Sequence, residues 1–132
     1  MKLSKLKLTK ESSSRVRFLA GKTGLTPNLL CRLGFCLSLA EPGMPNPDDY
    51  PEEDREFNRY TLLGEYDSLF IALLKERHYQ DGNEFALEDA FRAHMNRGVL
   101  LLQRRLKDIG QLGDLIARSS SVPSSAALPA KC

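Results

Sequence analysis

The sequence has no tryptophan, only two histidines and only three cysteines among its 132 residues. It also lacks any run of 18 or more apolar residues, so we expect no transmembrane helix. Polar residues, and not the apolar stretch of a signal peptide, follow the first lysines, so we expect a cytoplasmic protein. Cys31, Cys36 and Cys132 are odd in number and two lie in an apolar stretch, which argues against a disulfide framework and for reduced, buried thiols.

Charge is present in quantity but is unevenly placed. Residues 1–32 hold eight Lys/Arg and one acid, whereas residues 33–67 hold two Arg and nine acids. Such asymmetry is typical of a chain that meets a polyanion. Mutual neutralisation of the two segments in the fold explains it equally well, so both interpretations stay open at this point.

The first element predicted is a short strand over residues 3–9. Alternation places Leu6 and Leu8 on one face and Lys5, Lys7 and Thr9 on the other. A lone strand leaves its backbone groups unpaired, so a partner strand is required.

Two helices should follow the strand. The first has one of the serines at 12–14 as its N-cap and Gly21 as its stop. The second runs over residues 27–40, with Thr26 as N-cap and a proline in its first position.

The helix over residues 27–40 is apolar nearly all round, with only three polar residues. Such a helix must be covered on all sides, and a domain of this size has too little protein to cover it. We therefore expect another subunit to pack against it. The expected oligomer interface consists of Leu29, Leu33, Gly34, Cys36 and Leu37.

Prolines and acids over residues 41–56 indicate a loop, whose role the sequence leaves open between a solvated surface and a docking surface. Residues 57–63 fit either a strand or a helix start. Apolar spacing then predicts a helix over 66–79 with Asp67 as N-cap and a last helix over 87–109. We expect one domain over residues 1–117 and a disordered tail over 118–132.

The predicted fold is mainly α-helical, with a short N-terminal strand and a ribbon–helix–helix-like oligomerisation core. In a ribbon–helix–helix fold, two chains pair their N-terminal strands into a ribbon that can enter the DNA major groove. A ribbon rich in lysine favours phosphate contacts over base recognition, because lysine lacks the fixed fork of arginine.

Two features that could suggest other chemistry are weak. Gly21-Lys22-Thr23 lacks the upstream glycine and the following helix of a phosphate-binding P-loop. His78 and His94 lie on different predicted helices with no ligand spacing around them. We expect no catalytic residues, no metal and no cofactor.

Several stretches resemble the DndE family of DNA sulfur-modification proteins. They are KLKL at 5–8, RFL at 17–19, TGLTPNLLCRLGFC at 23–36, EFNRYTLLGEYD at 56–67 and HMNRGV at 94–99. The resemblance spans roughly residues 1–110. It implies a homotetrameric, non-catalytic subunit that binds DNA, nicked duplex in particular, alongside a sulfur transferase and an ATPase in a defence system of restriction–modification type.

The DNA-binding residues expected from the resemblance and the charge pattern are Lys2, Lys5, Lys7, Lys10, Arg15, Arg17 and Lys22. Two alternatives remain. One is a ribbon–helix–helix transcriptional repressor, and the other is an assembly adaptor whose basic segment binds protein. The sequence alone does not separate a tetramer from a dimer, identify the surface that meets partner subunits, or decide whether DNA binding is sequence-specific.

Overall fold

The computed structural model describes residues 4–118, and most of them are helical, as predicted. The strands and helices are β1 (Lys5–Lys7), α1 (Lys10–Thr23), α2 (Pro27–Ala40), the 3-10 turn η1 (Pro47–Asp49), β2 (Glu56–Asn58), α3 (Arg59–Leu63), η2 (Gly64–Tyr66), α4 (Asp67–Gln80) and α5 (Leu87–Arg118).

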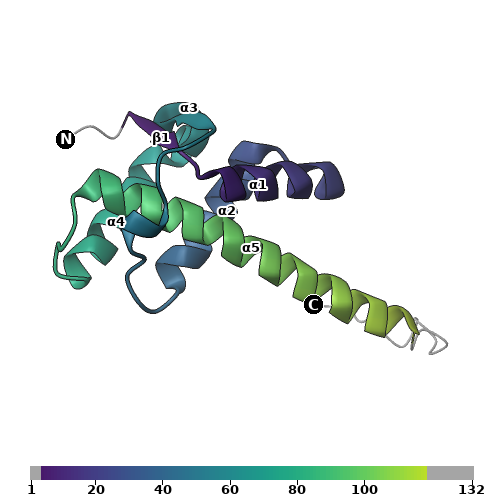
Figure 1. Ribbon diagram of the computed structural model, residues 1–132. Helices are drawn as coiled ribbons and strands as arrows, with labels where there is room; N and C mark the ends of the chain where they lie inside the picture. Colours follow the sequence, from purple (N-terminus) through teal and green to yellow (C-terminus); the bar gives the residue numbers. More distant parts are fainter. Residues whose placement is uncertain (1–3, 119–132) are drawn as a thin grey trace.

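The 32-residue helix α5 is the axis of the molecule. It crosses the structure with the other elements gathered along its first part, and its C-terminal part projects from the body (Figure 1). Phe35 of α2 packs edge-on against Phe91 of α5, with ring centroids 5.5 Å apart, and against Phe70 of α4 at 6.0 Å. Helices α2, α4 and α5 therefore share one aromatic core.

The backbones of α2 and α5 touch where each helix has a glycine. A Cβ built on Gly34 would lie 2.7 Å from the carbonyl carbon of Gly98, closer than real Cβ contacts come. Gly34 was expected at an oligomer interface, but it is buried here. The close approach that this glycine permits is within the chain.

Strand β1 pairs with β2 of the same chain. The pair is antiparallel, with Leu6 opposite Phe57 and Lys7 opposite Glu56. Leu6 and Leu8 are buried, as the alternation predicted. The ribbon–helix–helix detail is not confirmed, because the strand finds its partner within one chain and not in a second one.

The ends of α1 differ from those predicted. Its N-cap is Thr9, whose hydroxyl accepts a hydrogen bond from the Ser12 backbone N–H at 3.0 Å, whereas Ser12 and Ser13 are buried inside the helix. The helix continues through Gly21 and ends at Gly24, which adopts a left-handed φ of 80°. Gly24 is therefore the residue that terminates the helix with an αL conformation.

Helix α2 has the predicted bounds, and Thr26 is its N-cap, accepting from the Leu29 N–H at 3.2 Å. Residues 57–63 divide between the end of β2 and all of α3. Asp67 was predicted to be the N-cap of α4, but it is the first residue of that helix. Its carboxylate instead accepts two hydrogen bonds from Arg59, each 2.8 Å long.

Helix α5 continues past the predicted end at residue 109 to Arg118. The predicted end lies directly before Gly110, but a glycine inside a helix costs only about 1 kcal/mol and does not end it by itself. The predicted tail over 118–132 lies, apart from its first residue, outside the described residues. In the described part of the chain, no helix combines the length and apolar character needed to cross a membrane.

Candidate nucleic-acid interface

The predicted basic residues gather on β1 and on the outer side of α1. Lys5, Lys10, Arg17 and Lys22 are exposed, Lys7 and Arg15 are half-buried, and Lys2 lies outside the described residues. Thr9 was expected to share the outward face of the strand. It is buried as the cap of α1, and its N–H donates to Asn96 Oδ1 at 2.9 Å.

The cations on α1 form two pairs, one on each flank of its exposed side, because an offset of five residues turns them about 140° apart around the helix axis. Lys10 and Arg17 are seven residues apart, as are Arg15 and Lys22, and seven residues are close to two helical turns. Val16 and Leu19 are buried, so the opposite side of α1 faces the core. The outcome is an outer helix surface with four cations and one acid, Glu11.

Three carboxylates approach this basic surface. Glu56 lies 3.6 Å from the Lys5 ammonium, Glu11 lies 3.5 Å from Arg15, and Glu53 accepts from the Lys10 backbone N–H at 3.2 Å. The basic and acidic segments thus do meet within the chain. Both ion pairs are long and solvent-exposed, and such pairs contribute only about 0–1 kcal/mol. Such weak ion pairs leave Lys5 and Arg15 available to bind a polyanion.

Further basic residues, which sequence reasoning missed, lie on α5 beside α1. A groove of about 420 Å³ separates the two helices. Its lining consists of Glu11 and Arg15 from α1 and Leu100, Gln103, Arg104 and Lys107 from α5. The run Arg104-Arg105-Leu106-Lys107 was the one signal in the sequence that could have indicated them.

The predicted oligomer surface on α2 is partly open. Leu29, Leu33 and Cys36 are exposed on one side of the helix, and Leu37 is half-buried. We call Leu29, Leu33 and Cys36 the open α2 face. A groove of about 320 Å³, with Cys36 and Leu73 among its lining residues, connects this face to α4.

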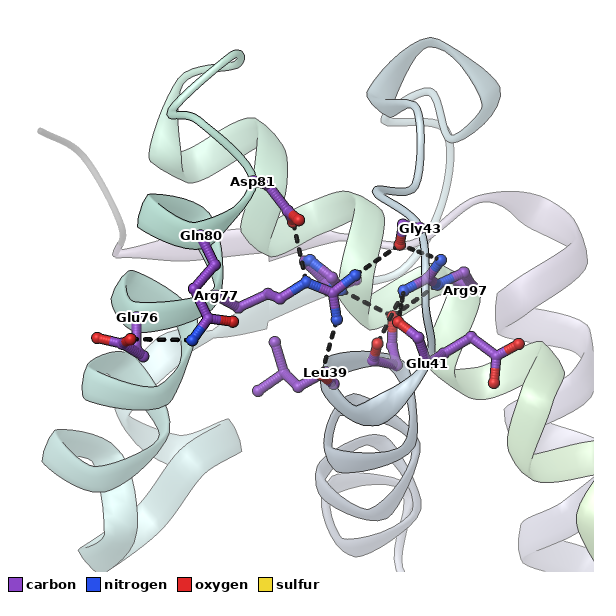
Figure 2. A network of polar contacts seen from close by, with 10 residues as sticks. Leu39, Glu41, Gly43, Glu76, Arg77, Gln80, Asp81 and Arg97 are labelled. Atoms are coloured by element: carbon purple, nitrogen blue, oxygen red, sulfur yellow. Dashed lines mark hydrogen bonds and ion pairs between the residues drawn. The ribbon is translucent and has the colours of Figure 1, made fainter.

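Two arginines fix the end of α2, as Figure 2 shows. Arg77 donates to the Leu39 and Gly43 carbonyls at 2.7 Å each and is paired with Asp81 at 2.9 Å. Arg97 donates to the Gly43 carbonyl at 2.8 Å and to both the hydroxyl and the carbonyl of Ser38. Carbonyls at a helix C-terminus have no partner within the helix, so these guanidinium groups act as its cap.

Beneath this cap lies a buried imidazole. Ser38 Oγ accepts from Arg97 and shares a hydrogen bond with His94 Nδ1, 2.8 Å away. Burial, with the nearby charges of Arg97 and Arg77 adding to it, lowers the pKa of His94 to about 3. The ring is neutral and fully enclosed, which makes it a packing residue and places it out of reach of a substrate.

The acidic segment is held by its backbone while its carboxylates face solvent. Arg92 donates to the Tyr50 carbonyl at 2.8 Å and to the Pro47 carbonyl at 3.4 Å. The exposed acids are Asp48, Asp49, Glu52, Glu53, Asp54 and Glu56.

The remaining candidates for chemistry have structural roles. Gly21-Lys22-Thr23 lies in the last turns of α1, where no P-loop can form. Cys31 is buried, and burial raises the pKa of its thiol to about 12, whereas Cys36, also expected to be buried, is exposed. Within residues 4–118, no three His, Cys, Asp or Glu side chains are grouped to hold a metal ion.

Comparison with known proteins places this arrangement in a family. The family model described as DNA sulphur modification protein DndE matches residues 5–108. The crystal structure of DndE from Escherichia coli B7A, involved in DNA phosphorothioation modification, superposes with a TM-score of 0.63 at 27% identity, covering 77% of this chain and 98% of that one. A DndE mutant structure gives 0.58 at 24% identity, covering 76% and 99%. No match was found among curated proteins.

Proposed function

The chain belongs to the DndE family, and we propose that it is a non-catalytic subunit of DNA phosphorothioation that binds double-stranded DNA, nicked or intact. The observation that carries the proposal is the set of exposed cations on β1 and on α1. Lys5, Lys10, Arg17 and Lys22 are all exposed on neighbouring elements. A duplex carries one negative charge per about 1.7 Å of its axis, and a surface of this kind gains affinity by releasing its counterions.

The same surface supports weak sequence preference. Lysine and arginine on the outside of a helix, without a segment shaped to enter a groove, contact phosphates more readily than base edges. Phosphate contacts fix the position of the protein on the duplex but carry no sequence information. The role we propose is to hold DNA for the partner proteins that insert sulfur, including a sulfur transferase and an ATPase.

We also propose that the subunit acts as a homo-oligomer, with the tetramer that the family resemblance implies. The open α2 face supports this, since it presents Leu29, Leu33 and Cys36 to solvent. Leu37 beside them is half-buried. Gly34 is left out of the proposed interface because it packs against Gly98.

An assembly adaptor is the second candidate function, and one observation favours it. The acids over residues 48–56 point outward from a backbone that Arg92 holds in place, as a docking surface would require. A repressor that inserts a two-chain ribbon into DNA is disfavoured, because β1 pairs with β2 of its own chain.

The deciding experiment measures DNA binding directly. Purified protein is titrated into fluorescent duplexes of random sequence, intact and singly nicked, at several salt concentrations, and anisotropy reports binding. We expect affinity to fall steeply with salt, little dependence on sequence and tighter binding to the nicked duplex. The log–log slope divided by about −0.9 counts the phosphates contacted. No binding at low salt would refute the DNA role and favour the adaptor.

A further inference from the structure

The groove between α1 and α5 brings together cations that are about 90 residues apart in the sequence. Arg15 lies on the α1 side, and Arg104 and Lys107 lie on the α5 side. Leu100, Gln103, Arg104 and Lys107 follow the spacing of one face of a helix, so the α5 wall is a continuous stripe. Cations from both helices thus face a single groove.

The groove also holds its own negative charge. Among the described residues that line it, Glu11 is the one acid. Its carboxylate lies 3.5 Å from Arg15 Nη2, one helical turn away. The Glu11 and Arg15 side chains are 62% and 42% exposed, so water screens their attraction, and a pair of this type contributes only about 0.3–0.5 kcal/mol.

We propose that this groove binds a phosphodiester of the DNA backbone and that Glu11 is a built-in competitor which the phosphate displaces from Arg15. The inference rests on the proposed DNA-binding function and adds to it a second contact region and a control on its strength. The displaced carboxylate turns outward to solvent, and no covalent step is involved.

The shape and chemistry of the groove fit a phosphodiester. The two guanidinium groups can each donate two parallel hydrogen bonds to phosphate oxygens, and Lys107 adds a point charge. Gln103 supplies a neutral donor, and Leu100 an apolar surface for a sugar ring. A volume of about 420 Å³ exceeds what an isolated ion needs, since a water molecule takes up about 30 Å³.

The net charge of the groove determines how strongly it attracts a phosphate. With Glu11 in place the groove carries two net positive charges, and without it three. A phosphate must therefore compete with a carboxylate for Arg15, and removal of that carboxylate should strengthen binding. This direction is opposite to the loss of affinity that most surface substitutions produce.

The test compares three full-length variants in the anisotropy titration. Glu11→Gln should tighten binding of a random intact duplex about two- to fivefold, the range that an exposed ion pair spans. The double variant Arg104→Gln with Lys107→Gln should weaken binding about tenfold and reduce the size of the log–log salt slope by about 1.8, for two lost phosphates. Lys75→Glu on α4 makes the same change in net charge as the double variant and should alter neither quantity appreciably.

The outcomes separate the groove from the proposed function. If wild-type protein binds DNA and the groove variants behave like Lys75→Glu, the groove inference is wrong and the DNA role stands. If wild-type protein binds no DNA, both fail. Competition by tripolyphosphate and by poly-glutamate distinguishes the source of the negative charge, and displacement of DNA by poly-glutamate at equal charge would overturn phosphate recognition. Melting temperatures of the variants, expected within a few degrees of wild type, exclude unfolding as the cause.

Discussion

Gly34 of α2 and Gly98 of α5 face each other with their backbones in contact, and neither position has room for a methyl group. A Cβ on Gly98 would meet the Gly34 carbonyl and lie 2.8 Å from the Phe35 backbone nitrogen. Backbone atoms cannot rotate away as the end of a long side chain can. The two helices would have to separate, and the aromatic contact of Phe35 with Phe91 would separate with them.

Gly98→Ala should therefore destabilise the protein by about 3 kcal/mol, the upper part of the usual range for overpacking. Chemical denaturation monitored by circular dichroism measures this. Gly21→Ala is the matched control, because Gly21 lies in α1 with nothing within 4 Å of its Cβ position. That substitution should stabilise by about 0.5–1 kcal/mol. Equal effects at the two positions would contradict the close contact between α2 and α5.

The buried His94 predicts a pH dependence of stability. Its pKa is about 3 in the folded protein and about 6.5 when unfolded, so the unfolded state binds the proton first as pH falls. The contribution of the neutral ring is fully present above pH 6.5 and is lost as pH falls from there towards 3. Between pH 6 and 5 the loss should approach about 1.4 kcal/mol per pH unit.

Unfolding free energies at pH 7, 6 and 5 measure this slope, and His94→Gln provides the comparison because it has no group that titrates in that range. The variant should be less stable at pH 7, since Ser38 loses its imidazole partner, but its stability should change less with pH. A wild-type protein equally stable at pH 7 and pH 5 would show that the ring is not held neutral by the fold.

Local chemistry made part of this fold predictable. Thr26 and the proline after it fix the start of α2, because a hydroxyl cap and a residue without an N–H both suit a first helical turn. Alternation in β1 likewise identified Leu6 and Leu8 as core residues. At the start of α2 and along β1, a few neighbouring residues are enough to determine the local structure.

Where several candidate residues compete for one position, the local pattern predicted the wrong residue. Thr9, and not a serine at 12–14, caps α1, because its N–H is held by Asn96 from a distant helix. Gly24, and not Gly21, ends α1, because Gly24 is the residue that adopts the left-handed conformation, with a φ of 80°. Tertiary contacts decide such choices, and no local pattern contains them.

The candidate site divides in the same way. The cations of β1 and α1 lie close together in the sequence, so the charge pattern and the family resemblance were enough to identify them. Arg104 and Lys107 lie near Arg15 only because α5 packs beside α1. Their shared groove depends on tertiary packing, so it could not be predicted from the sequence.

Neutralising the strand lysines should weaken DNA binding without regard to sequence. Lys5→Gln with Lys7→Gln removes two positive charges from β1, and the log–log salt slope should shrink by up to about 1.8. Lys75→Glu makes the same change in net charge at an exposed position on α4 and serves as the control. Anisotropy on two unrelated duplexes measures both. Unchanged affinity in the double variant would remove β1 from the binding surface, and a loss confined to one duplex would indicate base recognition.

Leu33 provides the corresponding test of self-association. It is 42% exposed at the centre of the open α2 face, so a polar side chain there leaves the core of the single chain intact. Covering a leucine at an interface contributes about 1.5–3 kcal/mol, so Leu33→Gln should raise the dissociation constant of the oligomer at least about tenfold. Light scattering after size-exclusion chromatography, over a dilution series, follows the mass of the oligomer.

Phe18→Gln on α1, where the ring is 56% exposed, makes an equally polar change away from that face and should leave the mass unaltered. If the Phe18 variant dissociates and the Leu33 variant does not, self-association runs through α1. The basic surface proposed for DNA would then be buried between copies of the chain.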